Sequence, residues 1–215
     1  DRRQRQMCIR DRSIPNPIDT KVYHPMDQGM ARELLGLPSG KRLLLFGALN
    51  VTDKRKGIDY LIEALRRMEK QDVELVVFGQ VKDDIRGLFP VPIHSMGYLS
   101  DESKIVALYN AVDMFITSSL EENLPNTIME SMACGTPCVG FEIGGIPEMI
   151  DHRVNGYVAN YKDAGDLANG IQWVLEHEDR LALSDACVKK VQENYTEEVV
   201  AKQYTALYEK LLKGE

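Results

Sequence analysis

Two glutamates and a short run of backbone amides could together bind a ligand that carries both phosphates and hydroxyls. Glu122 and Glu130 are separated by seven residues in the segment ENLPNTIMESMACGTP. Pro125 stands where a helix begins, and Gly135 followed by Pro137 is a normal helix stop. The free amides and positive dipole end of this helix suit a phosphate, whereas carboxylates beside an anion need hydroxyls or cations as partners. A sugar nucleotide would satisfy all of these groups.

The chain around this segment alternates short apolar runs with amphipathic patterns. The apolar runs predict strands at RLLLFGA, VELVVFG, VPIHSMG, DMFITSS, 137–141 and 156–158, and the amphipathic patterns predict helices at 57–68, 101–111, 126–134 and 146–151. Strands separated by such helices form parallel sheets with right-handed crossovers. We therefore expect an α/β fold, a Rossmann-like parallel sheet with helices on both faces.

Both ends of the chain differ from this alternation. The first twelve residues hold five Arg and two Asp without apolar periodicity, so 1–12 is interpreted as a disordered or non-native head. The proline-rich SIPNPIDTKVYHP predicts that 13–41 is an extended connector and lead-in, and that the ordered domain spans 42–215. From residue 163 onward three helical patterns follow without a strand, and the last carries an apolar stripe from Val200 to Leu211.

Composition excludes several classes of protein. The chain has 215 residues, 44% hydrophobic and 27% charged, and a formal charge of −7, which leaves no broad basic face for nucleic acid. No apolar run approaches the roughly 18 residues of a transmembrane segment. Four scattered cysteines, Cys8, Cys134, Cys138 and Cys187, predict reduced thiols and a cytoplasmic location rather than a disulfide framework or a metal site.

The segment around Glu122 and Glu130 resembles the Glu-x7-Glu signature of retaining glycosyltransferases of the GT-B fold, glycosyltransferase family 4. RKG at 55–57, the VVFG strand end, HSMGYLS, LYNAVDMFITSS, GGIPEMI and VNGYV follow in that family's order. The resemblance covers roughly 14–212 and corresponds to the C-terminal, donor-binding half of a GT-B fold. It implies a fragment that lacks the N-terminal acceptor domain and is inactive alone.

The resemblance also implies a role for each site residue. Glu122 would bind hydroxyls of the donor sugar, Glu130 would hold the ribose, and Lys56 would pair with the diphosphate; Glu122 and Lys56 are the expected catalytic residues. The backbone near Gly97 and Tyr98 would meet the nucleobase. The further expected substrate-binding positions are Arg55, Gly79, Asn123, Leu124, Pro125, Asn126 and Thr127.

No Asp-x-Asp pair follows a strand, so we expect no metal and no cofactor beyond the donor itself. Helix amides and Lys56 would then stabilise the departing nucleoside diphosphate. The family usually has an Arg after the glycine that ends the first strand, and Ala48 stands there in this chain. Arg55 could compensate for that change.

The resemblance implies a UDP-, GDP- or ADP-sugar donor and retaining transfer of a hexosyl group to a glycan or lipid-linked acceptor, in surface polysaccharide biosynthesis. The full-length enzyme could then lie at the inner face of the membrane. A catalytically silent nucleotide-sugar-binding module is the alternative. A nicotinamide oxidoreductase is disfavoured because the first strand lacks a following Gly-x-Gly-x-x-Gly turn.

Taken singly, several of these residues have a purely structural alternative. Glu130 could be a solvated helix residue and Lys56 a surface charge, since charged side chains are mostly exposed. His94 follows an apolar strand and is interpreted as a structural histidine. The function therefore depends on the joint pattern and not on one residue.

Overall fold

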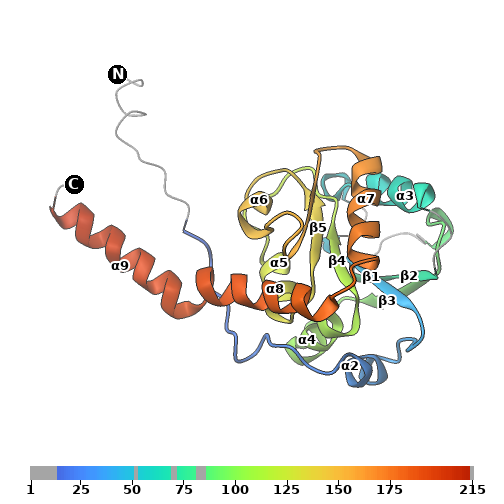
Figure 1. The fold of residues 1–215 in the computed structure, drawn as a ribbon, viewed down its shortest axis with the longest axis horizontal. Coiled ribbons are helices and arrows are strands. Elements are labelled where there is room, and N and C mark those ends of the chain that lie inside the picture. The colour runs from blue at the N-terminus through green and yellow to red at the C-terminus, as the bar shows by residue number, and fades with distance from the viewer. Residues whose placement is uncertain (1–13, 51–52, 69–71, 81–85, 214–215) are drawn as a thin grey trace.

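A parallel sheet with β1 and β4 at its centre organises the molecule (Figure 1). The computed structural model describes residues 14–50, 53–68, 72–80 and 86–213. Within them, six strands pair in the order β3-β2-β1-β4-β5-β6, and every pairing is parallel. The strands are β1 (Arg42–Asn50), β2 (Val73–Gln80), β3 (Ile93–Gly97), β4 (Met114–Thr117), β5 (Cys138–Phe141) and β6 (Gly156–Ala159). The expected Rossmann-like sheet is confirmed.

Helices cover both faces of this sheet. They are α2 (Gln28–Leu35), α3 (Ile58–Arg67), α4 (Glu102–Ala111), α5 (Asn126–Ala133), α6 (Ile146–Met149), α7 (Ala164–Leu175), α8 (Arg180–Asn194) and α9 (Glu197–Lys213), with short 3₁₀ turns η1 (Lys54–Lys56) and η2 (Arg86–Leu88). Helices α3 and α7 pack together over one face, and α2, α4, α5 and α8 over the other (Figure 1).

Alternation along β1 explains the two layers. Leu44 and Phe46 point into the core beneath α3 and α7. Leu43 and Leu45 point into the core beneath α4 and α5. Because successive side chains of a strand face opposite sides, a continuous apolar run indicates a strand that is buried on both faces.

The predicted strands and helices from 42 to 159 agree with the structure to within a few residues at their ends. The predicted helix at 57–68 is α3, for example, and the predicted helix at 146–151 is the shorter α6. The head at 1–12 lies outside the described residues, as does part of the polar segment between β2 and β3. For the described part of the chain, periodicity was a sufficient guide to the sheet.

Helix α2 lies in the lead-in, where the sequence analysis assigned no helix. Asp27 caps it by accepting a hydrogen bond from the Met30 amide, and Gly36 ends it with φ of 65°. The connector before it also packs on the domain: Ile18 is buried, and its amide donates to the Tyr195 carbonyl oxygen at 2.9 Å. The segment from Ile18 to Leu35 therefore lies along the side of the sheet that α4 and α8 cover.

Helix α9 extends away from the sheet (Figure 1). Of its predicted apolar stripe, Val200 is buried, whereas Tyr204, Tyr208 and Leu211 are exposed. Helix α7, in contrast, packs on the sheet, and α8 packs on α5. No helix among the described residues combines the length and apolar character needed to cross a bilayer.

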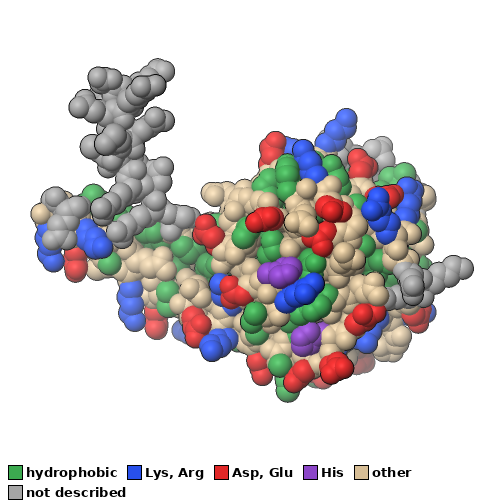
Figure 2. Space-filling view, turned by 45° about the horizontal axis from the view of Figure 1, so that its top comes forward, with side chains coloured by type: hydrophobic (Ala, Val, Ile, Leu, Met, Phe, Trp, Pro, Cys, Tyr) green, Lys and Arg blue, Asp and Glu red, His purple; other side chains and the backbone are tan. Residues whose placement is uncertain are grey.

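Charges of both signs share the surface. On the face that Figure 2 shows, Lys and Arg side chains are interspersed with Asp and Glu side chains and form no continuous basic area. An anionic ligand on this face would have to be bound by individual side chains and amides rather than by a basic surface.

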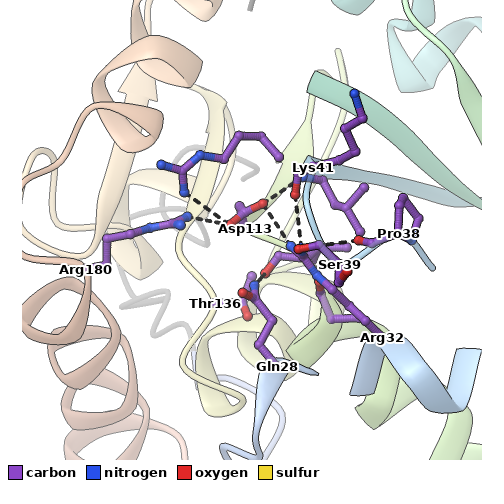
Figure 3. A network of polar contacts seen from close by, with 12 residues as sticks. Gln28, Arg32, Pro38, Ser39, Lys41, Asp113, Thr136 and Arg180 are labelled. Atoms are coloured by element: carbon purple, nitrogen blue, oxygen red, sulfur yellow. Dashed lines mark hydrogen bonds and ion pairs between the residues drawn. The ribbon is translucent and has the colours of Figure 1, made fainter. Parts of the chain in front are cut away.

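The carboxylate of Asp113, just before β4, joins three separate parts of the chain (Figure 3). It accepts hydrogen bonds from the Leu43 amide at 2.6 Å, from Arg32 at 3.1 Å and from Arg180 at 2.6 Å. Arg32 itself is buried and also donates from Nε to the Ala111 carbonyl oxygen at 2.7 Å. Helices α2 and α8 are thus tied to the amino ends of β1 and β4.

We expect Asp113→Ala to lower the free energy of unfolding by about 3 to 5 kcal/mol, because it leaves the buried Arg32 guanidinium without its counter-ion. Urea unfolding followed by circular dichroism measures this loss. Glu193→Ala is the control, since Glu193 and Lys189 form an exposed pair on α8 with N···O of 3.9 Å, worth about 0.5 kcal/mol or less. Equal losses in the two variants would contradict the role assigned to Asp113.

Candidate functional site

The connectivity of the sheet creates a switch point between β1 and β4. Chain order runs from β1 outward to β2 and β3 on one side, and from β4 outward to β5 and β6 on the other. Ligands of open parallel sheets bind at the carboxyl ends of the strands where this order reverses. The two segments that leave β1 and β4 there are 53–57 and 118–125, which carry half of the expected site residues, Lys56 and Glu122 among them.

The segment after β1 is fixed against the segment after β4. The Leu120 amide donates to the Arg55 carbonyl oxygen at 2.7 Å, and Ser118 Oγ donates to the Lys56 carbonyl oxygen at 3.0 Å. Gly57 has φ of 63°, and a Cβ on it would overlap the Ser118 carbonyl oxygen. Glycine is therefore required there both by the left-handed backbone and by the close approach.

The segment after β5 holds the other side of the same loop. The Gly145 amide donates to the Asn123 carbonyl oxygen at 2.5 Å. A Cβ on Gly144 would overlap the Glu122 carbonyl oxygen, so these two glycines let two backbones meet. Tyr161 Oη donates to the Leu120 carbonyl oxygen at 3.0 Å. The backbone around Glu122 is thus held from three directions.

Lys56 and Glu122 form an ion pair at the centre of this arrangement. Lys56 Nζ lies 2.5 Å from Glu122 Oε1, and the side chains are 32% and 14% exposed. Lys56 is therefore directed toward Glu122 and is not a freely solvated surface charge. The two side chains line an open recess of about 410 Å³ together with Arg55, Glu121 and Asn123.

Arg55 is directed elsewhere. Its guanidinium pairs with Asp53 at 2.7 Å, and its side chain is 68% exposed. The hydrogen bond from Arg55 lowers the pKa of Asp53 to about 2. Arg55 thus lies at the rim of the recess, with its charge already paired.

Helix α5 begins beside the recess. Pro125 is its N-cap and no side chain of the described residues caps it, so the Asn126 and Thr127 amides of the first turn remain available, whereas the Ile128 amide donates to the Pro125 carbonyl oxygen at 3.1 Å. Asn126 Oδ1 accepts a hydrogen bond from Asn16 at 3.4 Å, and Leu124 packs against Gly145. The helix begins at Asn126, as the predicted range 126–134 has it, and Pro125 is the residue before it.

Glu130 lies on the second turn of α5. Its Oε2 accepts a hydrogen bond from the hydroxyl of Tyr109 at 2.8 Å, and Tyr109 is fully buried. Burial raises the pKa of Glu130, while this hydrogen bond opposes the rise. Glu130 is therefore oriented by α4 and is not a solvated helix residue.

Gly79, Gly97 and Tyr98 lie at the carboxyl ends of β2 and β3, the same edge of the sheet. Gly79 and Gly97 have φ of 123° and 64°, and Tyr98 is exposed. The structure gives no hydrogen bond or ion pair between these three residues and Lys56 or Glu122 in the described part of the chain. They share the edge with the recess and do not line it.

The remaining candidates have structural partners. His94 Nε2 lies 2.6 Å from Glu74 Oε2 across β2 and β3, consistent with its interpretation as a structural histidine. Cys134, Cys138 and Cys187 are free and buried. Among residues 14–50, 53–68, 72–80 and 86–213, no group of three His, Cys, Asp or Glu is placed to hold a metal ion.

Sequence reasoning missed two tyrosines that support the site. Tyr109 orients Glu130, and Tyr161 holds the loop that carries Glu122. Tyr109 is 21 residues from its partner Glu130, and Tyr161 is 41 residues from its partner Leu120. No local sequence pattern shows contacts over such separations. The one sequence signal was Tyr109 itself, which directly follows the apolar run from Ile105 to Leu108.

Comparison with known proteins identifies relatives of this arrangement. The family model described as glycosyl transferases group 1 matches residues 40–177. N-acetyl-alpha-D-glucosaminyl L-malate synthase of Bacillus anthracis is 24% identical over 209 residues, which are 94% of this chain and 54% of that protein. The chain spans about half the length of the curated relatives it matches.

Solved structures share the fold. Anabaena Alr3699/HepE in complex with UDP-glucose superposes with a TM-score of 0.77 at 21% identity, over 92% of this chain and 57% of that chain. The C-terminal domain of the glycosyl transferase group 1 family protein LpcC from Francisella tularensis superposes with a TM-score of 0.69 at 21% identity, over 84% of this chain and 99% of that chain. The fold matches a complete C-terminal domain.

We expect Gly57→Ala to separate the two segments that form the recess. The added Cβ meets the Ser118 backbone oxygen, which cannot rotate away. Gly36→Ala is the matched control, because Gly36 has nearly the same φ, 65°, with nothing within 4 Å of an added Cβ. The control should lose about 1 to 2 kcal/mol of unfolding free energy from backbone strain alone, and Gly57→Ala about 2 kcal/mol more. Similar losses would show that the contact with Ser118 is unimportant.

Proposed function

This chain belongs to the glycosyl transferases of group 1, and we propose that it is the donor-binding domain of a retaining GT-B enzyme of glycosyltransferase family 4. In this proposal it binds a nucleotide-diphospho-sugar for transfer of a hexosyl group to a glycan or lipid-linked acceptor. The observation that carries the proposal is the convergence of Lys56, Glu122 and the uncapped N-terminus of α5 at the β1–β4 switch point.

The geometry supports a division of roles among these groups. The ammonium of Lys56 and the backbone amides at 123, 124, 126 and 127 are the hydrogen-bond donors that a diphosphate needs. Glu122 and Glu130 are acceptors for hydroxyls, of the sugar and the ribose respectively. The backbone of Gly97 and Tyr98 would meet the base at the same edge of the sheet.

In the reaction, the chain's contribution would be electrostatic. Negative charge grows on the diphosphate as the glycosidic bond to it breaks, and fixed donors at that position stabilise the transition state, each by about 2.7 to 4 kcal/mol. The contacts that hold 55–57 against 118–120 fix the backbone that carries these groups before the sugar nucleotide binds. The acceptor would attack from the face that the leaving group vacates, which retains the anomeric configuration.

The proposed enzyme contains an acceptor-binding half in addition to residues 42–215, with 13–41 as the lead-in between the halves. The coverage of relatives supports this, since the chain matches about half of each. Surface polysaccharide synthesis at the inner face of the membrane is proposed from the family resemblance. UDP is the first nucleotide to test because HepE, a structural neighbour, is in complex with UDP-glucose.

A catalytically silent sugar-nucleotide-binding module is the second candidate, and Ala48 favours it, because the family usually has Arg at that position of the β1 edge. Supplying an acceptor-binding half from a relative decides between the two. Sugar transfer by the mixture supports the enzyme, and nucleotide binding without transfer supports the module.

We expect Glu130→Ala to weaken binding of the bare nucleoside diphosphate by about ten- to a hundredfold, because a hydrogen bond between a carboxylate and a ribose diol contributes about 1.5 to 3 kcal/mol. Calorimetry with UDP, GDP and ADP measures the loss. Glu176→Ala is the control, since Glu176 accepts from Gln172 on α7 at the surface. Unchanged affinity in Glu130→Ala would remove Glu130 from the site.

We further expect nucleotide binding to persist in the presence of a chelator. Lys56 and the α5 amides would supply the positive charge that a divalent ion provides in many other sugar-nucleotide enzymes. Titration of the nucleoside diphosphate with EDTA, and then with added Mg²⁺ or Mn²⁺, measures this. Loss of binding with EDTA and its return with metal would contradict the proposed diphosphate site.

A further inference from the structure

The charges around the recess are already paired with one another. Arg55 pairs with Asp53, and Lys56 pairs with Glu122. Glu121 adds a third carboxylate at the rim. Two cations therefore face three carboxylates, and within the described residues the recess has no surplus of positive charge.

This pairing conflicts with simple binding of a diphosphate. If Lys56 turned toward a phosphate, Glu122 would lose its cation while its side chain is 14% exposed. An ionised carboxylate in that position, beside new negative charge, is strongly unfavourable. A nucleoside diphosphate alone offers Glu122 nothing in exchange.

An intact sugar nucleotide does offer an exchange, because its sugar hydroxyls can donate hydrogen bonds to the carboxylate. We propose that donor binding replaces the Lys56–Glu122 ion pair: the sugar hydroxyls take over Glu122, and the released ammonium of Lys56 moves to the diphosphate. This inference rests on the proposed function and deepens it. Its consequence is selectivity for the intact donor over the nucleoside diphosphate that remains after transfer.

The structure limits this exchange to side chains. Two hydrogen bonds join the segments on either side of the pair. Ser118 Oγ donates to the Lys56 carbonyl oxygen at 3.0 Å, and the Leu120 amide donates to the Arg55 carbonyl oxygen at 2.7 Å. The flexible four-carbon stem of lysine allows its ammonium to move while the backbone stays fixed. The carboxylate of Glu122 stays where the sugar arrives.

Glu122→Gln tests the exchange, because glutamine keeps the shape and removes the charge. The probes are UDP and UDP-glucose, with the GDP and ADP pairs run alongside, titrated calorimetrically into the complete 215-residue chain at low salt. We expect the wild type to bind the sugar nucleotide more tightly than its diphosphate. In Glu122→Gln we expect affinity for the bare diphosphate to rise about tenfold and the ratio of the two affinities to fall toward one.

Glu121→Gln is the matched control, since it removes the same charge one residue earlier from an exposed side chain. It should change both affinities by the same small factor and leave their ratio unaltered. A second measurement needs no change at Glu122: in protein labelled with ¹⁵N-lysine, the side-chain signal of Lys56, assigned with Lys56→Arg, should shift much further with the sugar nucleotide than with the diphosphate.

The outcomes separate the two proposals. If the wild type binds a nucleotide but Glu122→Gln binds its diphosphate no more tightly, or if Lys56 shifts equally with both probes, the exchange is wrong and the donor-binding function stands. If the wild type binds none of the six probes, the proposed function is wrong, and the exchange fails with it.

Discussion

The arrangement of this molecule depends on how β1 and β4 are held at both ends. At their amino ends, the buried carboxylate of Asp113 accepts from the Leu43 amide and pairs with Arg32. At their carboxyl ends, the segments that follow the strands meet at Gly57 and Ser118 without room for a Cβ. A buried ion pair contributes little net stability compared with apolar packing, but it fixes one geometry because any other leaves a charge unpaired. The shape of the recess therefore depends on the fixed positions of β1 and β4.

The cost of leaving a charge unpaired also applies in the recess, but there the ion pair is much less buried. The pair at Arg32 and Asp113 is 6% and 2% exposed, so separating it would leave a charge buried without a partner. The pair at Lys56 and Glu122 is 32% and 14% exposed and opens onto a recess. A partly solvated pair can exchange partners at much lower cost than a buried one. The degree of burial thus distinguishes the structural Arg32–Asp113 pair from the Lys56–Glu122 pair, which we propose that a ligand opens.

The sheet and the motif could be predicted from the sequence because both are local. Apolar runs and helical periods lie within 5 to 15 residues, and Glu122 and Glu130 lie on one continuous turn and helix. Helix α2 was not predicted because its buried side chains are the small Ala31 and the charged Arg32, while its apolar Met30 is exposed. The pairing of Lys56 with Glu122 spans 66 residues and follows only from the β1–β4 neighbourhood, which chain order does not specify.

Net charge sets the final constraint on how such a site selects its ligand. The chain carries a formal charge of −7, so its long-range field repels a nucleotide anion rather than attracting it. Screening limits that field to about 8 Å at physiological ionic strength, which is shorter than the domain. In the proposed function, recognition occurs at contact distance, through backbone amides, the Lys56 ammonium and the carboxylates of Glu122 and Glu130. In the proposed exchange, phosphates alone bind weakly because the recess has no surplus positive charge, and sugar hydroxyls that satisfy Glu122 strengthen their binding.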